Sequence, residues 1–158
     1  MYDAVSYSGV LKANLSSHGK AMIPTYSFDK ADVIVGIGCD FLGNWMTGPE
    51  TERQYGMTRK VSADKKTMSK HYQFEAQLSL TGANADERYP VKPSQYGEIA
   101  LGLLQAVGGD GASSSVAGVD VVGAALKGAN GKALVVCGSN DPAVQLVDRC
   151  SRAPQRPP

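Results

Sequence analysis

The chain has 158 residues, of which 42% are hydrophobic and 20% are charged, and its formal net charge is +1. This length and composition are typical of one globular domain or of part of a larger one. The near-neutral charge gives no basis for binding nucleic acid, and without a run of eighteen apolar residues we expect no direct membrane span.

Taken in order, the chain alternates helical patterns with short strand patterns. A helix is expected over residues 2–14 and another over residues 49–59, where Pro49 and Glu50 suit a first turn. Between them, residues 33–37 (VIVGI) form an apolar run that is typical of a strand buried on both faces of a parallel sheet. An exposed loop over residues 61–70 is expected to follow the second helix.

The second half predicts more strands and helices. We expect a strand over residues 71–78, with Tyr72, Phe74 and Leu78 on one side, and a loop rich in hydroxyl groups over residues 79–86. Residues 89–93 look extended, and Ser94 is a plausible N-cap for the next helix. The remaining expected elements are a helix over 97–107, a flexible loop over 108–115, a helix over 119–126, a buried strand over 134–137 and a helix over 142–152.

These elements predict an α/β fold with three layers and a Rossmann-like, mostly parallel sheet, whose interior strands are 33–37 and 134–137. The domain is expected to span residues 1–152, followed by a disordered, proline-rich tail over 153–158. Ligands of open α/β sheets bind just past the carboxyl ends of strands, which makes residues 38–40 (GCD) a candidate site. A GxGxxG fingerprint is missing there, so a plain dinucleotide-binding domain is not indicated.

The residues that usually carry metal or nucleophilic chemistry are scattered. Cys39, Cys137 and Cys150 form no CxxC motif, and His18 and His71 are isolated in the sequence. This pattern favours neither a zinc or iron–sulfur site nor a catalytic triad within the chain. We therefore predict no metal ligand and no catalytic residue here, and no turnover of a quinol by this chain alone.

Four segments together resemble the molybdopterin oxidoreductase superfamily. Residues 38–41 (GCDF) loosely match its strand end Gly-Ser-Asn-Pro, and residues 79–86 (SLTGANAD) match its Thr-x-Thr-Ala-x-x-Ala-Asp loop. Residues 89–96 (YPVKPSQY) are similar to the segment Ile-Pro-Ile-Arg-Pro-Gly-Thr-Asp. The later residues 138–142 (GSNDP) resemble its second Gly-x-Asn-Pro strand end, with one residue inserted.

One branch of the superfamily is more similar over roughly residues 2–147. The segments LSLTGANAD and GKALVVCGSND resemble the large iron–sulfur subunit of alternative complex III, a bacterial membrane complex that oxidises quinol. This resemblance implies a scaffold domain without its own cofactor, at the periplasmic face of the inner membrane, with other subunits of a respiratory complex as partners. It also implies that the iron–sulfur clusters lie elsewhere in the full subunit. The chain looks clipped at both ends, as a fragment would.

The superfamily's cofactor is molybdopterin guanine dinucleotide, and the resemblance implies where it would bind. The corresponding residues here are Gly38, Asp40, Thr81, Asn84, Lys92, Ser94 and Gln95. The match departs at residues 94–96, where SQY replaces the guanine-reading Gly-Thr-Asp, and at residues 75–77, where EAQ replaces a motif containing a phosphate-facing arginine. A carboxylate accepts two N–H groups from the edge of guanine, and glutamine and tyrosine are weaker substitutes.

Three interpretations remain open. A cofactor-free scaffold predicts an apolar, partner-facing surface around Phe41, Leu42 and Trp45. A working molybdopterin-dependent oxidoreductase predicts that the dinucleotide is bound at the residues named above. An unrelated α/β binding module is the third. For the scaffold we expect a vestigial cleft, in which residues 38–40, 81–84 and 93–95 converge and Phe41 helps to fill the space between them.

Overall fold

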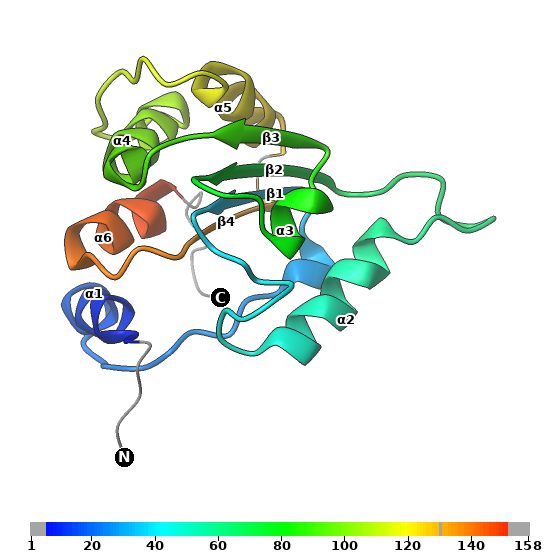
Figure 1. Ribbon diagram of the computed structural model, residues 1–158, viewed down its shortest axis with the longest axis horizontal. Coiled ribbons are helices and arrows are strands. Elements are labelled where there is room, and N and C mark those ends of the chain that lie inside the picture. The colour runs from blue at the N-terminus through cyan, green and yellow to red at the C-terminus, as the bar shows by residue number, and fades with distance from the viewer. Residues whose placement is uncertain (1–5, 130, 152–158) are drawn as a thin grey trace.

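The sheet has four strands that all run parallel, in the order β3-β2-β1-β4. The computed structural model describes residues 6–129 and 131–151. The strands are β1 (Val33–Ile37), β2 (Lys70–Glu75), β3 (Glu87–Pro90) and β4 (Ala133–Cys137). In Figure 1 the carboxyl ends of the strands lie at the left and their amino ends at the right. The predicted class, an α/β fold with helices on both faces of a parallel sheet, is confirmed.

Helices cover the two faces of the sheet unequally (Figure 1). They are α1 (Ser8–His18), α2 (Gly48–Arg59), α3 (Leu80–Ala83), α4 (Tyr96–Ala106), α5 (Val119–Gly128) and α6 (Pro142–Ser151), with 3₁₀ turns η1 (Phe28–Lys30) and η2 (Pro93–Gln95). Helices α4 and α5 pack together on one face, α6 packs against α4 and β4, and α1 packs on α6. Helix α2 and η1 lie together on the opposite side.

The first core lies between the sheet and α4 and α5. Every second side chain of β1 lies in this core, because successive residues of a strand point to opposite faces. Ile99, Leu103 and Val122 are fully buried against these strand residues. The sheet side chains of this core are Val33, Val35, Ile37, Tyr72, Phe74, Val135 and Cys137. Apolar side chains at every second residue of the strands therefore pack against apolar side chains spaced three to four residues apart in α4.

The second core, on the opposite face, contains aromatic residues from both sides of β1 in the sequence: Phe28 before the strand, and Phe41, Trp45 and Tyr55 after it. The rings of Phe28 and Phe41 have centroids 4.7 Å apart, and those of Tyr26 and Trp45 are 5.4 Å apart. Phe41 is fully buried, and Leu42 and Trp45 are less than a tenth exposed. The prediction that these three residues form a partner-facing surface is therefore wrong, because their apolar side chains are part of the chain's own core.

Other expectations about single elements need correction. Strand β2 ends at Glu75, and Leu78 is 65% exposed rather than packed with Tyr72 and Phe74. The predicted loop after it contains the short helix α3, where the Ser79 side chain caps the first turn by accepting a hydrogen bond from the Gly82 N–H. Strand β4 lies at an edge of the four-stranded sheet, so the prediction that it is an interior strand is wrong.

The start of α4 also differs from expectation. Ser94 lies within η2 and Gln95 occupies the N-cap position, so the prediction that Ser94 caps this helix is wrong. Residues 108–115 form an irregular segment, as predicted, but Glu98 anchors its end by accepting hydrogen bonds from Ser114 and Ser115. The predicted helix over 2–14 begins at Ser8. Its residues 2–5, the tail over 153–158 and the last residue of the predicted 142–152 helix lie outside the described residues.

Candidate functional site at the carboxyl edge of the sheet

The two glycine turns predicted from the sequence meet at the carboxyl edge of the sheet. After β1 the chain passes to the second core, whereas after β4 it enters α6 beside α4. Neighbouring parallel strands whose connections diverge in this way form the crevice where α/β folds bind ligands. The Gly138 N–H donates to the carbonyl of Ile37, and a Cβ on Gly138 would lie 2.2 Å from the Gly38 oxygen. The two turns are therefore in backbone contact.

Tyr96 covers this crevice. Gly38 has a positive φ of 59°, and a Cβ placed on it would lie 2.3 Å from Cε2 of Tyr96. The Tyr96 hydroxyl accepts a hydrogen bond from the backbone of Ala76, just beyond β2, and burial raises the pKa of the tyrosine. The aromatic ring thus lies against the end of β1, at the position where the resemblance would place a guanine-reading carboxylate.

Asp40 and Thr81, two of the predicted site residues, are in direct contact. The Asp40 carboxylate accepts hydrogen bonds from the backbone N–H and the hydroxyl of Thr81, at 3.0 and 2.7 Å. The Thr81 hydroxyl oxygen in turn accepts the N–H of Leu42 at 2.9 Å, and Thr81 is fully buried. This arrangement joins the turn after β1 to α3, and it uses hydrogen-bonding groups that a ligand would otherwise need.

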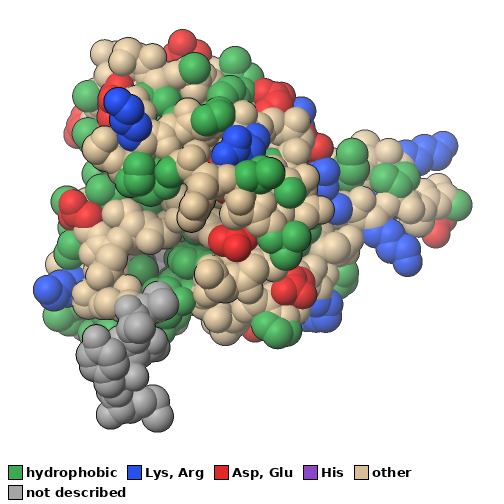
Figure 2. Space-filling model, viewed as in Figure 1, with side chains coloured by type: hydrophobic (Ala, Val, Ile, Leu, Met, Phe, Trp, Pro, Cys, Tyr) green, Lys and Arg blue, Asp and Glu red, His purple; other side chains and the backbone are tan. Residues whose placement is uncertain are grey.

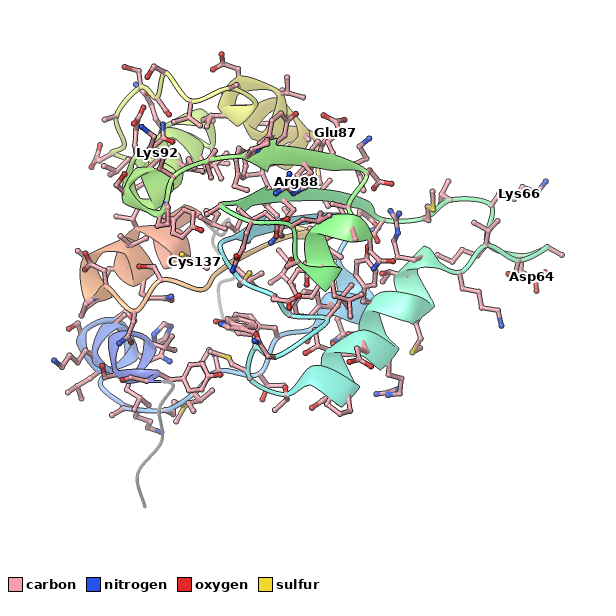
Figure 3. The ribbon with its side chains drawn as sticks, viewed as in Figure 1. Asp64, Lys66, Glu87, Arg88, Lys92 and Cys137 are labelled. Atoms are coloured by element: carbon pink, nitrogen blue, oxygen red, sulfur yellow. The ribbon has the colours of Figure 1, made fainter. Side chains whose placement is uncertain are left out.

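The other predicted site residues do not join this contact. Asn84 is exposed, and its side chain donates to the carbonyl of Leu80 on its own helix. Lys92 and Ser94 are exposed beyond the carboxyl end of β3, and Figure 3 shows Lys92 beside α4. The Gln95 side chain accepts the backbone N–H of Lys92 at 2.9 Å. The structure therefore brings Gly38, Asp40 and Thr81 together. The other four predicted site residues, Asn84, Lys92, Ser94 and Gln95, lie outside this contact.

Glu75, at the end of β2, is a site residue that the prediction did not include. Its carboxylate lies 2.5 Å from Nε of Arg88 and accepts the Ser79 hydroxyl at 2.6 Å. Burial pushes the pKa of Glu75 upward, but hydrogen bonds from Ser79 and Arg88 outweigh burial and hold the pKa below its usual value. A Cβ on Gly82 would lie 1.9 Å from this carboxylate, so a larger residue there would have to displace the Glu75 side chain.

Behind Glu75, a row of polar side chains crosses the face of the sheet under α2. His71 and Gln73 are fully buried, and Nδ1 of His71 lies 3.0 Å from the Tyr55 hydroxyl. Gln73 donates to the carbonyl of Cys39 at 3.0 Å, whereas its own Oε1 and His71 Nε2 have no partner of good geometry. Burial lowers the pKa of His71 to about 4, so the imidazole is neutral near pH 7.

The sequence contained a signal for this row. His71, Gln73 and Glu75 alternate with Tyr72 and Phe74, which is the period of a strand. Such alternation usually marks a face in contact with water, and here α2 and the turn after β1 cover it instead.

Within residues 6–129 and 131–151 no group of three His, Cys, Asp or Glu side chains is arranged to hold a metal ion. The same part of the chain contains no helix with the length and apolar character needed to cross a membrane.

Comparison with known proteins adds no relative to this description. No protein family model matches the chain, and a search of curated proteins finds no match.

Proposed function

We propose that this chain is a scaffold domain of a bacterial electron-transfer subunit, one that holds no cofactor of its own and belongs to a membrane-bound complex that oxidises quinol. The proposal places the domain at the extracytoplasmic face of the inner membrane. Iron–sulfur clusters would be held by other parts of the full subunit. It rests on the similarity of residues 38–41, 79–86, 89–96 and 138–142 to the molybdopterin oxidoreductase superfamily.

The observation that favours a scaffold over a cofactor-binding enzyme is the position of Tyr96. Its ring lies against Gly38 in the crevice, where a bound dinucleotide would need open space. Asp40 and Thr81 satisfy each other, and Glu75 pairs with Arg88 at 2.5 Å, so this cation is already neutralised and is not free to pair with a pyrophosphate. Each of these features lowers the expected affinity for molybdopterin guanine dinucleotide.

Phe41 has a different role in this proposal from the one expected from the sequence. It was expected to fill the crevice, but its ring packs fully buried against Phe28 and His71 in the second core. Tyr96 alone is therefore the residue to change when the crevice is to be opened. Replacing it with alanine removes the ring, whereas phenylalanine keeps the ring and removes only the hydroxyl.

The test uses the native complex. The tagged full-length subunit is purified from membranes of its host, and iron, molybdenum and guanine nucleotide released by acid are measured alongside quinol oxidation. We expect copurifying membrane subunits, iron and quinol oxidation, with molybdenum and nucleotide well below one per subunit. Stoichiometric dinucleotide would refute the scaffold and favour the molybdopterin-dependent enzyme. If wild type and Tyr96→Phe lack the nucleotide and Tyr96→Ala gains it, Tyr96 is what closes the site.

A further inference from the structure

A projecting segment, residues 60–69, extends from the main body of the molecule between α2 and β2 (Figures 1 and 2). We call this segment the arm. All of its residues from 60 to 68 are exposed, and Figure 3 shows Lys66 and Asp64 at its outer end. Large apolar side chains occur on the arm and just before it: Met57 is 54% exposed, Val61 55% and Met68 51%.

The arm is held at its base and at its tip. At the base, the N–H of Ser69 donates to the carbonyl of Thr58 at 3.2 Å, and Arg59 donates to the carbonyl of Ser69 at 2.5 Å. Arg59 is itself fixed by two hydrogen bonds to Asp86, at 2.6 and 2.9 Å. At the tip, the N–H of Ser62 donates to the carbonyl of Lys65 at 2.9 Å and closes a turn. A projection ordered in this way loses less conformational entropy on binding.

A hollow of about 590 Å³ lies between the arm and the amino edge of the sheet. Arm residues Lys65, Thr67 and Met68 form one wall, and residues that precede β1 and β4 form the other. The ammonium group of Lys65 donates to the carbonyls of Met57 and Thr58 at the end of α2, at 3.1 and 2.9 Å. The hollow therefore combines a cationic group with the exposed thioether of Met68.

The charges of this surface favour an acidic ligand. Arm and hollow together carry five lysines and three aspartates, a net charge of +2 in a chain whose total is +1. The lysines are Lys30, Lys60, Lys65, Lys66 and Lys132, and the aspartates are Asp29, Asp32 and Asp64. Asp32 and Lys132 neutralise each other at 3.3 Å, which leaves the excess positive charge on the arm and beside it.

We propose that the arm and the hollow form a docking site for an extended segment of a partner protein that carries acidic side chains beside an apolar one. The acidic groups would pair with Lys60, Lys65 and Lys66, and the apolar group would pack on Met68. A lipid surface fits less well, because a basic residue near an anionic membrane contributes about 1 kcal/mol, so an excess of two is too weak to hold a protein there. The concave hollow also suits a chain segment better than a flat surface.

This inference goes beyond the proposed function, since it needs a partner protein but not a respiratory one. The test places a photo-reactive benzoylphenylalanine at position 61 of the full-length protein in its host, which leaves all three lysines of the proposed site in place. Cross-linked segments are then identified by mass spectrometry. In this background we compare Lys60→Glu and Met68→Ser with the matched controls Lys20→Glu and Leu15→Ser, which change exposed residues outside the arm.

We expect one cross-linked protein segment that contains Asp or Glu next to an apolar residue. Lys60→Glu and Met68→Ser should each lower the cross-linking yield about tenfold, as for residues central to an interface, and neither control should. The unfolding midpoints of all four variants should stay near wild type, because each side chain is exposed. Raising the salt concentration should also lower the yield.

Three results would overturn the docking site. They are equal yields in arm and control variants, a cross-linked segment without acidic residues, and cross-linking to lipid together with sedimentation on phosphatidylglycerol vesicles but not on phosphatidylcholine vesicles. An acidic partner that belongs to no quinol-oxidising complex would leave the docking site intact and count against the proposed function instead. The two ideas therefore fail on different observations.

Discussion

Nε of Arg88 on the edge strand β3 lies 2.5 Å from a carboxylate oxygen of Glu75 at the end of β2. The Glu75 side chain is 5% exposed, so water screens the pair only weakly. Replacing Arg88 with methionine should lower the free energy of unfolding by about 2–4 kcal/mol, because the buried carboxylate loses its counter-ion. Chemical denaturation of the purified protein measures this. Arg53→Met, on the exposed surface of α2, is the control and should change little.

The same pair should make stability depend on acidity. The pKa of Glu75 is held below its usual value of about 4.5, so its contribution is complete above that pH and is lost as pH falls through the lower pKa of the folded state. The difference in unfolding free energy between wild type and Arg88→Met should therefore narrow as the pH falls below 4.5. A difference that stays constant to pH 2 would contradict this assignment.

His71 should make a separate contribution at higher pH. Burial lowers its pKa from 6.5 to about 4, so the unfolded state binds a proton that the folded state does not between these two values. Stability should be fully present above pH 6.5 and should fall by at most about 3 kcal/mol as pH drops toward 4. His71→Asn should flatten this part of the curve, and unfolding measured at several pH values checks it. If the NMR signals of the His71 imidazole titrate near pH 6.5 in the folded protein, the assignment is refuted.

The contact between the two glycine turns should tolerate no side chain. A Cβ on Gly138 would approach the Gly38 oxygen to 2.2 Å, so Gly138→Ala must separate the ends of β1 and β4. We expect a loss of about 3 kcal/mol in unfolding free energy. Gly56→Ala is the matched control, because Gly56 lies within α2 with open space around it and alanine should stabilise the helix by about 1 kcal/mol. Similar effects of both substitutions would show that the contact is absent.

Glu98 should determine the order of the segment between α4 and α5. Its Oε1 accepts hydrogen bonds from the Ser114 hydroxyl, the Ser115 N–H and the Ser115 hydroxyl, at 3.1, 3.0 and 3.2 Å. Glu98→Ala should therefore speed amide exchange at Ser115 and cleavage by proteases within residues 108–115. Gln105→Ala, an exposed change on the same helix, should leave both unchanged. Equal protection in Glu98→Ala would mean that packing alone orders the segment.

The parts of the fold that could be predicted are those specified by local pattern. Strand β1 has the predicted bounds Val33–Ile37, because an apolar run between Asp32 and Gly38 leaves little choice of where a strand begins and ends. The helices α2, α4 and α5 likewise fall within one or two residues of their expected ranges. Helix α3 was missed, because its single turn depends on the Ser79 cap and on contacts with Glu75 rather than on periodicity.

The site was harder to predict than the fold. That Gly38, Asp40 and Thr81 come together follows from parallel strands ending at one edge, and that much was expected. Burial of Phe41 and Trp45 was not, since an apolar loop after a strand is equally compatible with a surface and with a core. The difference depends on Phe28, more than ten residues earlier, whose ring packs against Phe41 at an angle of 38°. Contacts of this kind are not encoded in any single segment.

The pairing of β1 with β4 has a consequence for biosynthesis. Val33 pairs with Ala133, so one edge of the central strand stays open until another 100 residues have been made. At roughly 5–20 residues per second, the ribosome leaves that apolar edge without its partner for about 5–20 s. An unpaired strand edge readily pairs with another chain, so the nascent protein is exposed to misassembly throughout this interval. A chaperone that shields residues 33–37 during synthesis should raise the yield of folded protein more than one that acts after release.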